Sequence, residues 1–429
     1  MRIGVAILLL YDWLQRLANF ELLYTEKGIF SNGFLQHSGY LGSGDWSLFF
    51  LSGSEKFTLT LFAIGILFSV AMLVGVFTSF SIVISWVLQV SIQNKNPFVL
   101  HSGDSLLLLV LILFFFLNLS KDISSQEKRR KELEFLGLNF FIFFLAILGF
   151  IFITTSLHFI SALNKFSKEW LSDFNAVYYV FSNKDYSRNF TSVFLNYPLI
   201  LKFFCISTVA IEFIAPLLIL AGFRCKKFKN IGLLLLLILQ AGMLFFLTIS
   251  WFNFLVIILL LFVWLIPFEF IVENIKIFFS KGAINSIFKL KAFSAYLIFI
   301  LICCSTLLNI RQFPYQASKS LSFTLRLLKI NADWAMFSPS VRKDQVLIQI
   351  KNGKSSNLQA KKLGFINGKE HRLVKLRENI HLLNDHNLNM QVKKYLINPR
   401  NDSIDLTLEI RRPKSAFSTA YLRNSQLLR

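Results

Sequence analysis

The sequence is poor in charged residues and in cysteine, and each shortage excludes classes of protein. Only 16% of the residues are charged while 55% are hydrophobic, and the mean hydropathy is +0.57, so the chain is more apolar than a soluble globular fold can bury. The four cysteines lie in or beside apolar segments and indicate no redox compartment. Phosphate-binding loops, GxGxxG, HExxH and paired CxxC signatures are missing. These observations exclude a soluble enzyme.

Long apolar runs recur through the first three quarters of the chain. Lipid forces such runs into helices, because a bilayer offers the backbone no other hydrogen-bond partners. The predicted spans are residues 3–19, 57–77, 79–93, 102–119, 138–162, 198–222, 230–249, 251–267 and 290–309. The break between the second and third spans rests on residues 75–79 alone. The first span lacks a small-residue cleavage site before Asp12 and Arg16, so we interpret it as a retained helix.

Basic residues in two loops set the expected orientation. The loops at residues 121–134 and 224–229 are rich in lysine and arginine, and the positive-inside rule places them in the cytoplasm. The N-terminus is then cytoplasmic, while residues 11–56, 91–102, 164–198 and the C-terminal tail are extracytoplasmic. Residues 268–290 have an amphipathic pattern, which fits an interfacial helix but which we interpret as a cytoplasmic connector.

The tail differs from the rest of the chain in charge and in pattern. From Asn309 onward it has 22 basic and 8 acidic residues, which is most of the formal charge of +21. In a membrane protein this excess favours anionic lipid headgroups over nucleic acid. Apolar alternation at 346–350, 390–397 and 404–410, with turns at 352–353 and 367–368, predicts strands. The predicted fold is an all-α polytopic membrane bundle of about nine transmembrane helices with a small C-terminal β-rich extracytoplasmic domain.

Polar residues at the ends of apolar spans are candidates for function because they are costly there. Lys165 ends the fifth span, with Ser161 before it and Trp170 behind it. A lysine that is partly kept from water can act as a base near neutral pH. The alternative is a lysine that snorkels to the interface beside an anchoring tryptophan.

A second group of polar residues enters the fourth span. Asn94 and Asn96 precede His101 and Asp104, which are three residues apart and can share one side of that helix. The alternative is that Ser102 or Asp104 caps the helix and that the amides close a turn.

Glu212 lies near the middle of the sixth span, with Pro216 one turn further on. His158 precedes Lys165 by two helical turns, at a depth that roughly matches that of Glu212. We therefore predict a contact between His158 and Glu212 that supports the site structurally. His37, His371, His381 and His386 are too scattered to predict a metal site, and we interpret them as surface residues.

Several segments together resemble one family of membrane proteins. They are Arg2-Ile3-Gly4 with Asp12 and Arg16, Gln93-Asn94-Lys95-Asn96-Pro97 leading to Gly103-Asp104, Ala162-Leu163-Asn164-Lys165-Phe166 with Trp170 and Ala176-Val177-Tyr178-Tyr179, Glu212, and Trp334-Ala335-Met336-Phe337-Ser338-Pro339. In order and spacing they resemble the HTTM family, bacterial membrane proteins similar to the transmembrane part of vitamin K-dependent gamma-glutamyl carboxylase. The resemblance implies a helical domain at 1–310, a connector at 311–340 and the β-rich domain at 341–429, in the bacterial cytoplasmic membrane.

The resemblance also implies an activity. In the carboxylase a lysine at the position of Lys165 deprotonates vitamin K hydroquinone, which reacts with oxygen to give a strongly basic alkoxide. That base removes a γ proton from a glutamate, and the carbanion captures carbon dioxide. By this resemblance Lys165 is the base, Asn94, Asn96 and His101 orient the site in place of an Asn-Asn-His stretch, and Asp104, Trp170 and Tyr178 bind reduced vitamin K or menaquinone.

The departures from the family pattern limit this expectation. Asn164 stands where the eukaryotic enzyme has a second lysine, and Asp173-Phe174-Asn175 replaces the usual glycine before the Ala-x-Tyr-Tyr segment. The expected partners are the bilayer, a membrane quinone and a peptide or protein substrate docked on the tail. Two other functions stay open: a non-enzymatic maturation or export factor for a peptide or toxin, in which the tail is the working part, and, less favoured, a transporter, for which no inverted repeat is visible.

Overall fold

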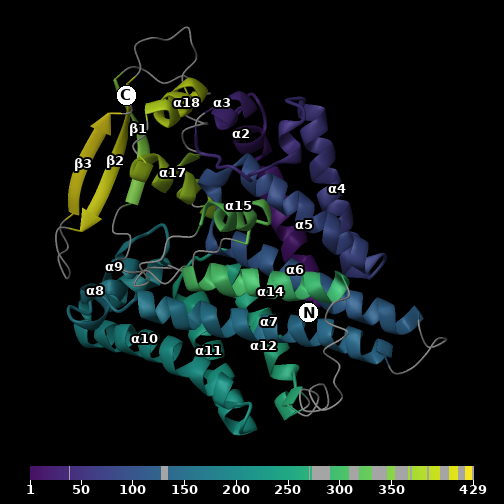
Figure 1. Ribbon diagram of the computed structural model, residues 1–429. Helices are drawn as coiled ribbons and strands as arrows, with labels where there is room; N and C mark the ends of the chain where they lie inside the picture. The colour runs from purple at the N-terminus through teal and green to yellow at the C-terminus, as the bar shows by residue number, and fades with distance from the viewer. Residues whose placement is uncertain are drawn as a thin grey trace.

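A computed structural model describes most of the chain. The described residues are 1–37, 39–126, 134–269, 271–272, 290–308, 318–330, 345–352, 366–367, 370–383, 386–396, 405–413 and 421–427. Within them the chain is mostly helical, with one small sheet near the C-terminus (Figure 1). The basic run at 128–131, most of the connector at 268–290 and the segment at 334–339 lie outside the described residues.

Each predicted span coincides with a helix, and most of the helix ends lie within a few residues of the predicted ends. The helices are α1 Arg2–Ala18, α4 Glu55–Val74, α5 Thr78–Lys95, α6 Ser102–Gln126, α7 Glu134–Asn164, α10 Pro198–Ala221, α11 Lys226–Phe246, α12 Phe252–Leu265 and α14 Leu290–Leu308. The break between α4 and α5 is confirmed. Gly75 ends α4 in the left-handed region at φ 94°, a conformation that glycine adopts without a steric cost.

Four segments are long and apolar enough to cross a membrane. They are Glu55–Val74, Phe141–Asn164, Pro198–Ala221 and Lys226–Phe246. Helices α4, α10 and α11 also expose large apolar side chains; Leu67, for example, is 61% exposed and Phe203 64% exposed. These features are compatible with an integral membrane protein. That all nine helices cross a bilayer, and in which orientation, stays a prediction.

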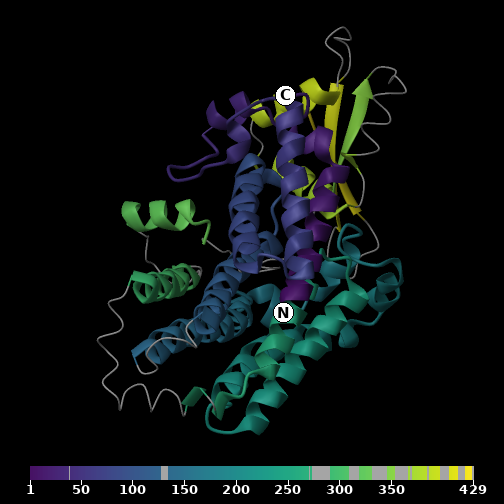
Figure 2. The same cartoon turned by 90° about the vertical axis from the view of Figure 1, so that its right-hand side faces the viewer.

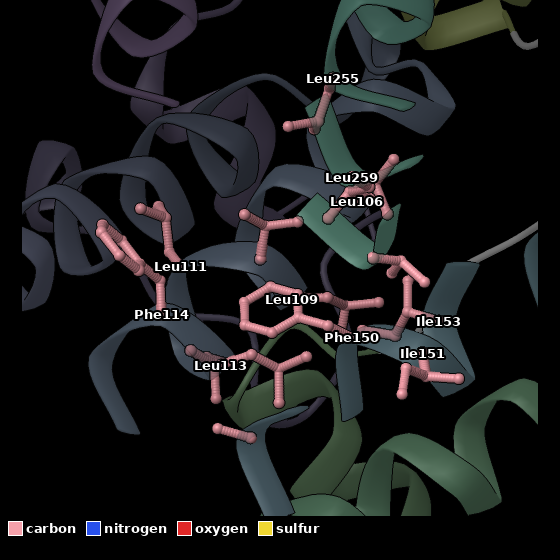
Figure 3. Packing of buried hydrophobic residues seen from close by; sticks show 14 of the residues in the cluster. Leu106, Leu109, Leu111, Leu113, Phe114, Phe150, Ile151, Ile153, Leu255 and Leu259 are labelled. Carbon is pink, nitrogen blue, oxygen red and sulfur yellow. The ribbon is translucent and has the colours of Figure 1, made fainter. Parts of the chain in front are cut away.

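Helix α7 is the centre of the bundle. It packs against α6, α10, α12 and α14, and its neighbours α6 and α12 also contact each other. Figure 3 shows the core at this junction, where Leu109 of α6, Phe150 of α7 and Leu259 of α12 are buried in one cluster. Gly149 allows the close approach of α6, because a Cβ there would lie 2.6 Å from a methyl carbon of Leu113.

Short helices fill the connections between the long ones. They are α2 Phe20–Tyr24, α3 Asn32–His37, α8 Lys168–Leu171, α9 Ala176–Ser182 and α15 Lys319–Leu327, with 3-10 turns at Leu48–Phe50, Pro97–Val99 and Asn189–Asn196. Ser318 caps α15 by accepting a hydrogen bond from the amide of Leu321 at 3.2 Å. Figure 2 shows α15 and α14 on the same side of the bundle.

The C-terminal part contains helices as well as strands. Strands β1 Gln345–Asn352, β2 Asp405–Pro413 and β3 Tyr421–Leu427 form an antiparallel sheet in the order β1-β2-β3. The strands predicted at 346–350 and 404–410 are confirmed. The strand predicted at 390–397 is wrong, since this segment belongs to helix α18, His386–Leu396. Its Leu388 and Val392 are buried while Met390 between them is 47% exposed, which fits a helical and not an alternating pattern.

Helix α17, His371–Leu383, joins this part to the ends of the long helices. The side-chain amide of Asn379 donates to the carbonyl oxygen of Phe98 at 2.6 Å, and Glu378 accepts a hydrogen bond from the hydroxyl of Tyr186. Trp46, in the first of the three loops that we expect on one face, donates to the carbonyl of Leu327 at the end of α15 at 2.9 Å. All three loops therefore contact segments that follow α14. Which side of a membrane these loops face stays a prediction.

Candidate functional site

Lys165 is buried at the end of α7. Its side chain is 3% exposed, and its ammonium nitrogen Nζ donates to the hydroxyl of Ser161 at 2.5 Å and to Oε2 of Glu212 at 2.7 Å. Helical side chains point back towards the N-terminus, which brings Lys165 over Ser161 one turn earlier. The snorkelling alternative is wrong, because the amine points into the bundle.

Glu212 therefore has a different partner from the one predicted. We expected His158, but the carboxylate pairs with Lys165 across the α7–α10 contact. The ring of His158 instead contacts the carbonyl of Thr154 at 2.9 Å through Nδ1 and the amide of Gln240 at 3.2 Å through Nε2. The lysine stem is long enough to reach Glu212, so the depth argument selected the wrong side chain.

Aromatic rings flank this pair. The ammonium of Lys165 lies 5.4 Å from the ring centre of Trp170 on α8. Phe213, next to Glu212, stacks on Phe159 at 5.2 Å and contacts Phe166 at 5.8 Å. Trp170 and the predicted quinone-binding residue Tyr178 are buried in the same apolar cluster. The site thus joins an amine, a carboxylate and a hydroxyl to several aromatic surfaces.

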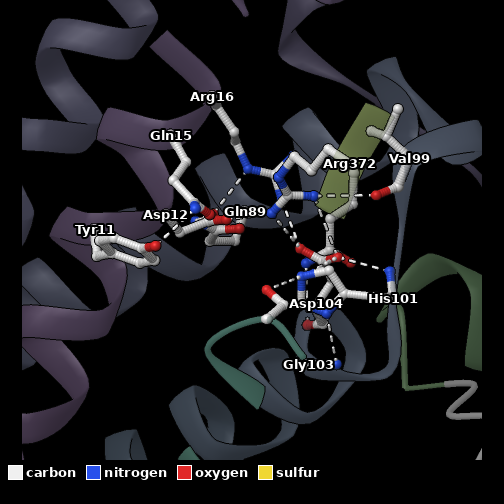
Figure 4. Close-up of polar contacts among 12 residues, drawn as sticks. Tyr11, Asp12, Gln15, Arg16, Gln89, Val99, His101, Gly103, Asp104 and Arg372 are labelled. Carbon is white, nitrogen blue, oxygen red and sulfur yellow. Dashed lines mark hydrogen bonds and ion pairs between the residues drawn. The ribbon is translucent and has the colours of Figure 1, made fainter. Parts of the chain in front are cut away.

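A second buried polar group forms where α17 meets α1 and α6 (Figure 4). Arg16 contacts Asp12 at 2.8 Å and Asp104 at 2.6 Å. Arg372 of α17 binds the same two carboxylates, with 3.1 Å to Asp104 and a close contact to Asp12. All four side chains are at most 1% exposed. We call Asp12, Arg16, Asp104 and Arg372 the charge cluster; its two positive and two negative charges balance.

The electrostatics of the charge cluster follow from this balance. Burial disfavours the charged form of Arg372, but Asp104 and Asp12 keep its pKa well above the usual value for arginine. The amide of Gln89 also donates to Asp12 at 2.9 Å, and the backbone amide of His101 donates to Asp104 at 2.9 Å. Asp104, predicted to bind a quinone, is thus held by charged and backbone donors.

His101 adjoins the charge cluster and contacts residues from distant parts of the chain. Its Nε2 lies 3.2 Å from the hydroxyl of Ser250 and 3.6 Å from Asp104, and its ring lies 5.0 Å from that of His371. Burial lowers the pKa of His101 to about 4 and lowers the pKa of His371 well below its usual value. His371 is partly buried against His101, so its interpretation as a surface residue is wrong.

Ser250, His101 and Asp104 do not form a catalytic triad. The backbone amide of Gly103 donates to Nδ1 of His101 at 3.0 Å, so in the neutral ring the proton is on Nε2. Nε2 is the atom that faces Ser250, and there it can donate but not accept a proton. The geometry excludes His101 as a general base towards this serine.

Asn94 and Asn96 hold loops in place. Asn94 donates to the carbonyl of Trp46 at 2.8 Å and accepts from the amine of Lys329 at 2.6 Å. Asn96 donates to the carbonyl of Leu23 at 3.1 Å and caps the following turn. The structure thus brings Lys165 together with Glu212 and Trp170, and His101 together with Asp104. The two asparagines instead contact other parts of the chain, Asn94 at Trp46 and Lys329 and Asn96 at Leu23.

Sequence reasoning missed Arg372 and underused two residues that it had noted. Asp12 and Arg16 lie four residues apart within an apolar helix, a spacing that predicts an intrahelical pair, and charges in such a helix indicate a role in structure or function. Arg372 lies in a polar segment with several other basic residues, and its sequence neighbours do not distinguish it from them.

The comparisons with known proteins add no relatives: no protein-family model, no curated protein and no solved structure matches this chain. The resemblance to the HTTM family therefore stays a prediction based on the residues quoted above.

Proposed function

We propose that the chain is an integral membrane enzyme of the gamma-glutamyl carboxylase type and a member of the HTTM family. It would use a reduced naphthoquinone, oxygen and carbon dioxide to modify glutamate in a peptide or protein. The buried amine of Lys165 is the observation that carries this proposal. A lysine buried beside a hydroxyl, a carboxylate and an aromatic ring is placed to take a proton from a ligand hydroxyl.

The residues around Lys165 fit a reduced naphthoquinone in two ways. The rings of Trp170 and Phe213 provide flat apolar surfaces for an aromatic ring system. Nζ of Lys165 and Oε2 of Glu212 are the polar atoms that a ligand hydroxyl would meet there, and the carboxylate oxygen can accept a hydroxyl proton. In the proposed complex Trp170 and Tyr178 hold the rings, and Lys165 faces a hydroxyl. When bound, the quinol would supply, by reaction with oxygen, the strong base that a glutamate γ proton requires.

The chain itself has three tasks in this proposal. Lys165 takes a proton at Nζ. Ser161, one turn earlier on α7, fixes the direction of that amine through the 2.5 Å hydrogen bond. The surrounding aromatic side chains keep water away from the reacting proton, which strengthens each electrostatic interaction. The same apolar helices allow a lipid-soluble ligand to enter from the bilayer side.

Oxygen-dependent epoxidation of reduced menaquinone tests the proposal. We would compare wild-type protein in lipid nanodiscs with Lys165→Met and with Lys168→Met, three residues away, whose side chain is 79% exposed. We expect epoxide from the wild type and from Lys168→Met, and at least about a hundredfold less from Lys165→Met, as for the loss of a general base. Equal epoxide from both variants, or none from a folded wild type with several quinols, refutes the proposal.

The maturation-factor alternative needs a different test from removal of the tail. Deleting residues 341–429 also removes Arg372 and leaves two buried aspartates with one arginine, so the truncated chain is expected to misfold. Substitutions at exposed positions of α17 and α18, such as Leu382 and Met390, leave the charge cluster intact. Loss of peptide maturation in these variants, with Lys165→Met still active, favours the alternative.

A further inference from the structure

The connection between α9 and α10 exposes large apolar side chains. The sequence predicts an extracytoplasmic loop at residues 164–198, yet Val193 in this loop is 58% exposed, and Leu199 at the start of α10 is 81% exposed. A contiguous apolar surface indicates contact with a partner, whereas single exposed apolar residues do not. Six such residues on this connection, on α10 and at the end of α11 form what we call the apolar patch: Phe190, Val193, Tyr197, Leu199, Phe203 and Phe245.

The apolar patch is built on three adjoining segments. The ring of Phe190 lies 5.1 Å from that of Phe245 on α11. Val193 follows Phe190 by one turn of the 3-10 helix Asn189–Asn196, so both lie on one side of it. The ends of α10 and α11 also touch, because the rings of Phe204 and Phe246 lie 5.4 Å apart.

The apolar patch continues into two candidate membrane spans. On α10 the exposed Leu199, Phe203 and Ile206 follow one another at a helical spacing, so they line one side of the helix. On α11 the exposed Ile238 precedes Phe245 by about two turns. Both helices are long and apolar enough to cross a membrane. The medium that covers the exposed faces of α10 and α11 therefore also extends over the patch.

Hydrogen bonds hold the connection at a fixed level along these helices. The backbone amide of Arg188 donates to the carbonyl of Phe246 at 3.1 Å, and the amide of Thr248 donates to the carbonyl of Tyr186 at 2.8 Å. Behind the patch the ring of Phe194 lies 5.5 Å from that of Phe246. The patch is therefore joined to α11 through its backbone and its rings.

The exposed charges beside the apolar patch are all basic. In the stretch 184–202, which the structure describes throughout, they are Lys184, Arg188 and Lys202. The acidic residue of this stretch, Asp185, is buried and contacts Arg377 at 3.4 Å. Basic groups beside an apolar surface match the layer where anionic headgroups meet acyl chains. Tyr197 fits the same layer, because tyrosine is enriched where a membrane meets water.

We propose that the apolar patch is a membrane anchor, whose side chains lie among the acyl chains of one leaflet just inside the headgroups. Lipid fits better than a second copy of the chain, because a symmetric contact would bring the basic groups of two chains together. The inference does not rest on the proposed function. The rings behind the patch share a cluster with Trp170 and Tyr178, so the anchor holds the candidate site at Lys165 close to one surface of the bilayer.

Fluorescence quenching of the full chain in lipid vesicles tests the anchor. Alanine replaces the four native cysteines, and one new cysteine, Val193→Cys or Leu382→Cys, carries a polarity-sensitive label. Leu382 on α17 is the matched control, because the two native side chains are 58% and 59% exposed. Bromine atoms on the acyl chains quench from the lipid, and iodide quenches from water. We expect bromine to quench the label at 193, at a depth of about 5–10 Å inside the headgroup boundary, and iodide to quench the label at 382.

Three results would overturn the inference. Quenching at 193 by iodide alone places the patch in water, and quenching by neither agent shows that protein covers it. Equal bromine quenching at both positions shows that the label enters the lipid without the patch.

A second pair of variants needs no label and keeps the native cysteines. We expect Val193→Asp to unfold at a lower temperature in vesicles than Leu382→Asp, because a carboxylate among acyl chains is costly. Equal unfolding temperatures for the two variants would also overturn the inference. Neither experiment depends on epoxidation, so a failure of the proposed function leaves the anchor standing.

Discussion

Arg372→Met should strongly destabilise the fold, because it removes one charge from a balanced buried set. In the native chain Arg372 contacts Asp104 at 3.1 Å and also pairs with Asp12, with all of these side chains at most 1% exposed. The variant leaves two aspartates to share Arg16. Removing one partner of a buried pair costs about 3–5 kcal/mol, since the remaining charge is left uncompensated.

The assay is a denaturant titration of the full chain in detergent micelles, followed by circular dichroism. The control is Lys27→Met, which breaks the 3.0 Å pair with Glu55 at a site where both side chains are mostly exposed. We expect no measurable change for the control, because surface pairs are screened by solvent. The two variants remove the same kind of charge, so the difference between them reports burial.

A double variant separates charge balance from packing. Asp104→Asn in the Arg372→Met background leaves Asp12 with Arg16, one charge of each sign. We expect the double variant to recover at least about 1 kcal/mol relative to Arg372→Met, as coupled neighbours do. Strict additivity of the two substitutions, or an Arg372→Met variant within about 1 kcal/mol of the wild type, would refute the charge-balance reasoning.

The other two predictions concern pH and packing. Folding lowers the pKa of His101 from 6.5 to about 4 and also lowers the pKa of His371. Between these pH values the unfolded chain binds more protons than the folded chain. The contribution of these histidines to stability is therefore complete above about pH 6.5 and declines as the pH falls towards about 4. The slope of unfolding free energy against pH in this window should decrease in His101→Gln, and no change in slope would contradict the assignment. Gly65→Ala should destabilise the α1–α4 contact by about 1–3 kcal/mol, since its Cβ would lie 2.3 Å from the Trp13 ring. In Gly242→Ala, where the added Cβ would meet no atom within 4 Å beyond its chain neighbours and its own helix backbone, thermal unfolding should be unchanged or occur at a higher temperature.

The helices were largely predictable from sequence, because a long apolar run permits few other structures. Both ends of α10, at Pro198 and Ala221, lie within one residue of the prediction. The C-terminal part was harder. The few apolar residues of α18 fit a two-residue and a four-residue spacing about equally well. Only the exposure of Met390 between the buried Leu388 and Val392 distinguishes the helix from a strand.

Several buried polar residues could be singled out from the sequence, but their pairs could not, and Arg372 was missed. Lys165, Glu212 and Asp104 all attracted attention as polar groups in apolar segments. Which charges meet depends on helix rotation and on side-chain reach, and a single sequence specifies neither. Arg372 illustrates this point, because it is more than 260 residues from Asp104 and its segment contains no apolar run that would predict burial.

The chain thus handles buried charge in two contrasting ways, and the contrast supports separate roles. In the charge cluster each aspartate accepts hydrogen bonds from both arginines, which lie on α1 and α17, so no single proton can move without breaking the balance, which suits a fixed joint between α17 and the bundle. Lys165 and Glu212 form one buried pair on two helices, in which each charge faces one partner of opposite sign. Under the proposed function, a ligand hydroxyl that approaches Lys165 competes with one partner of opposite charge, whereas in the charge cluster it would have to disturb a network of four charges.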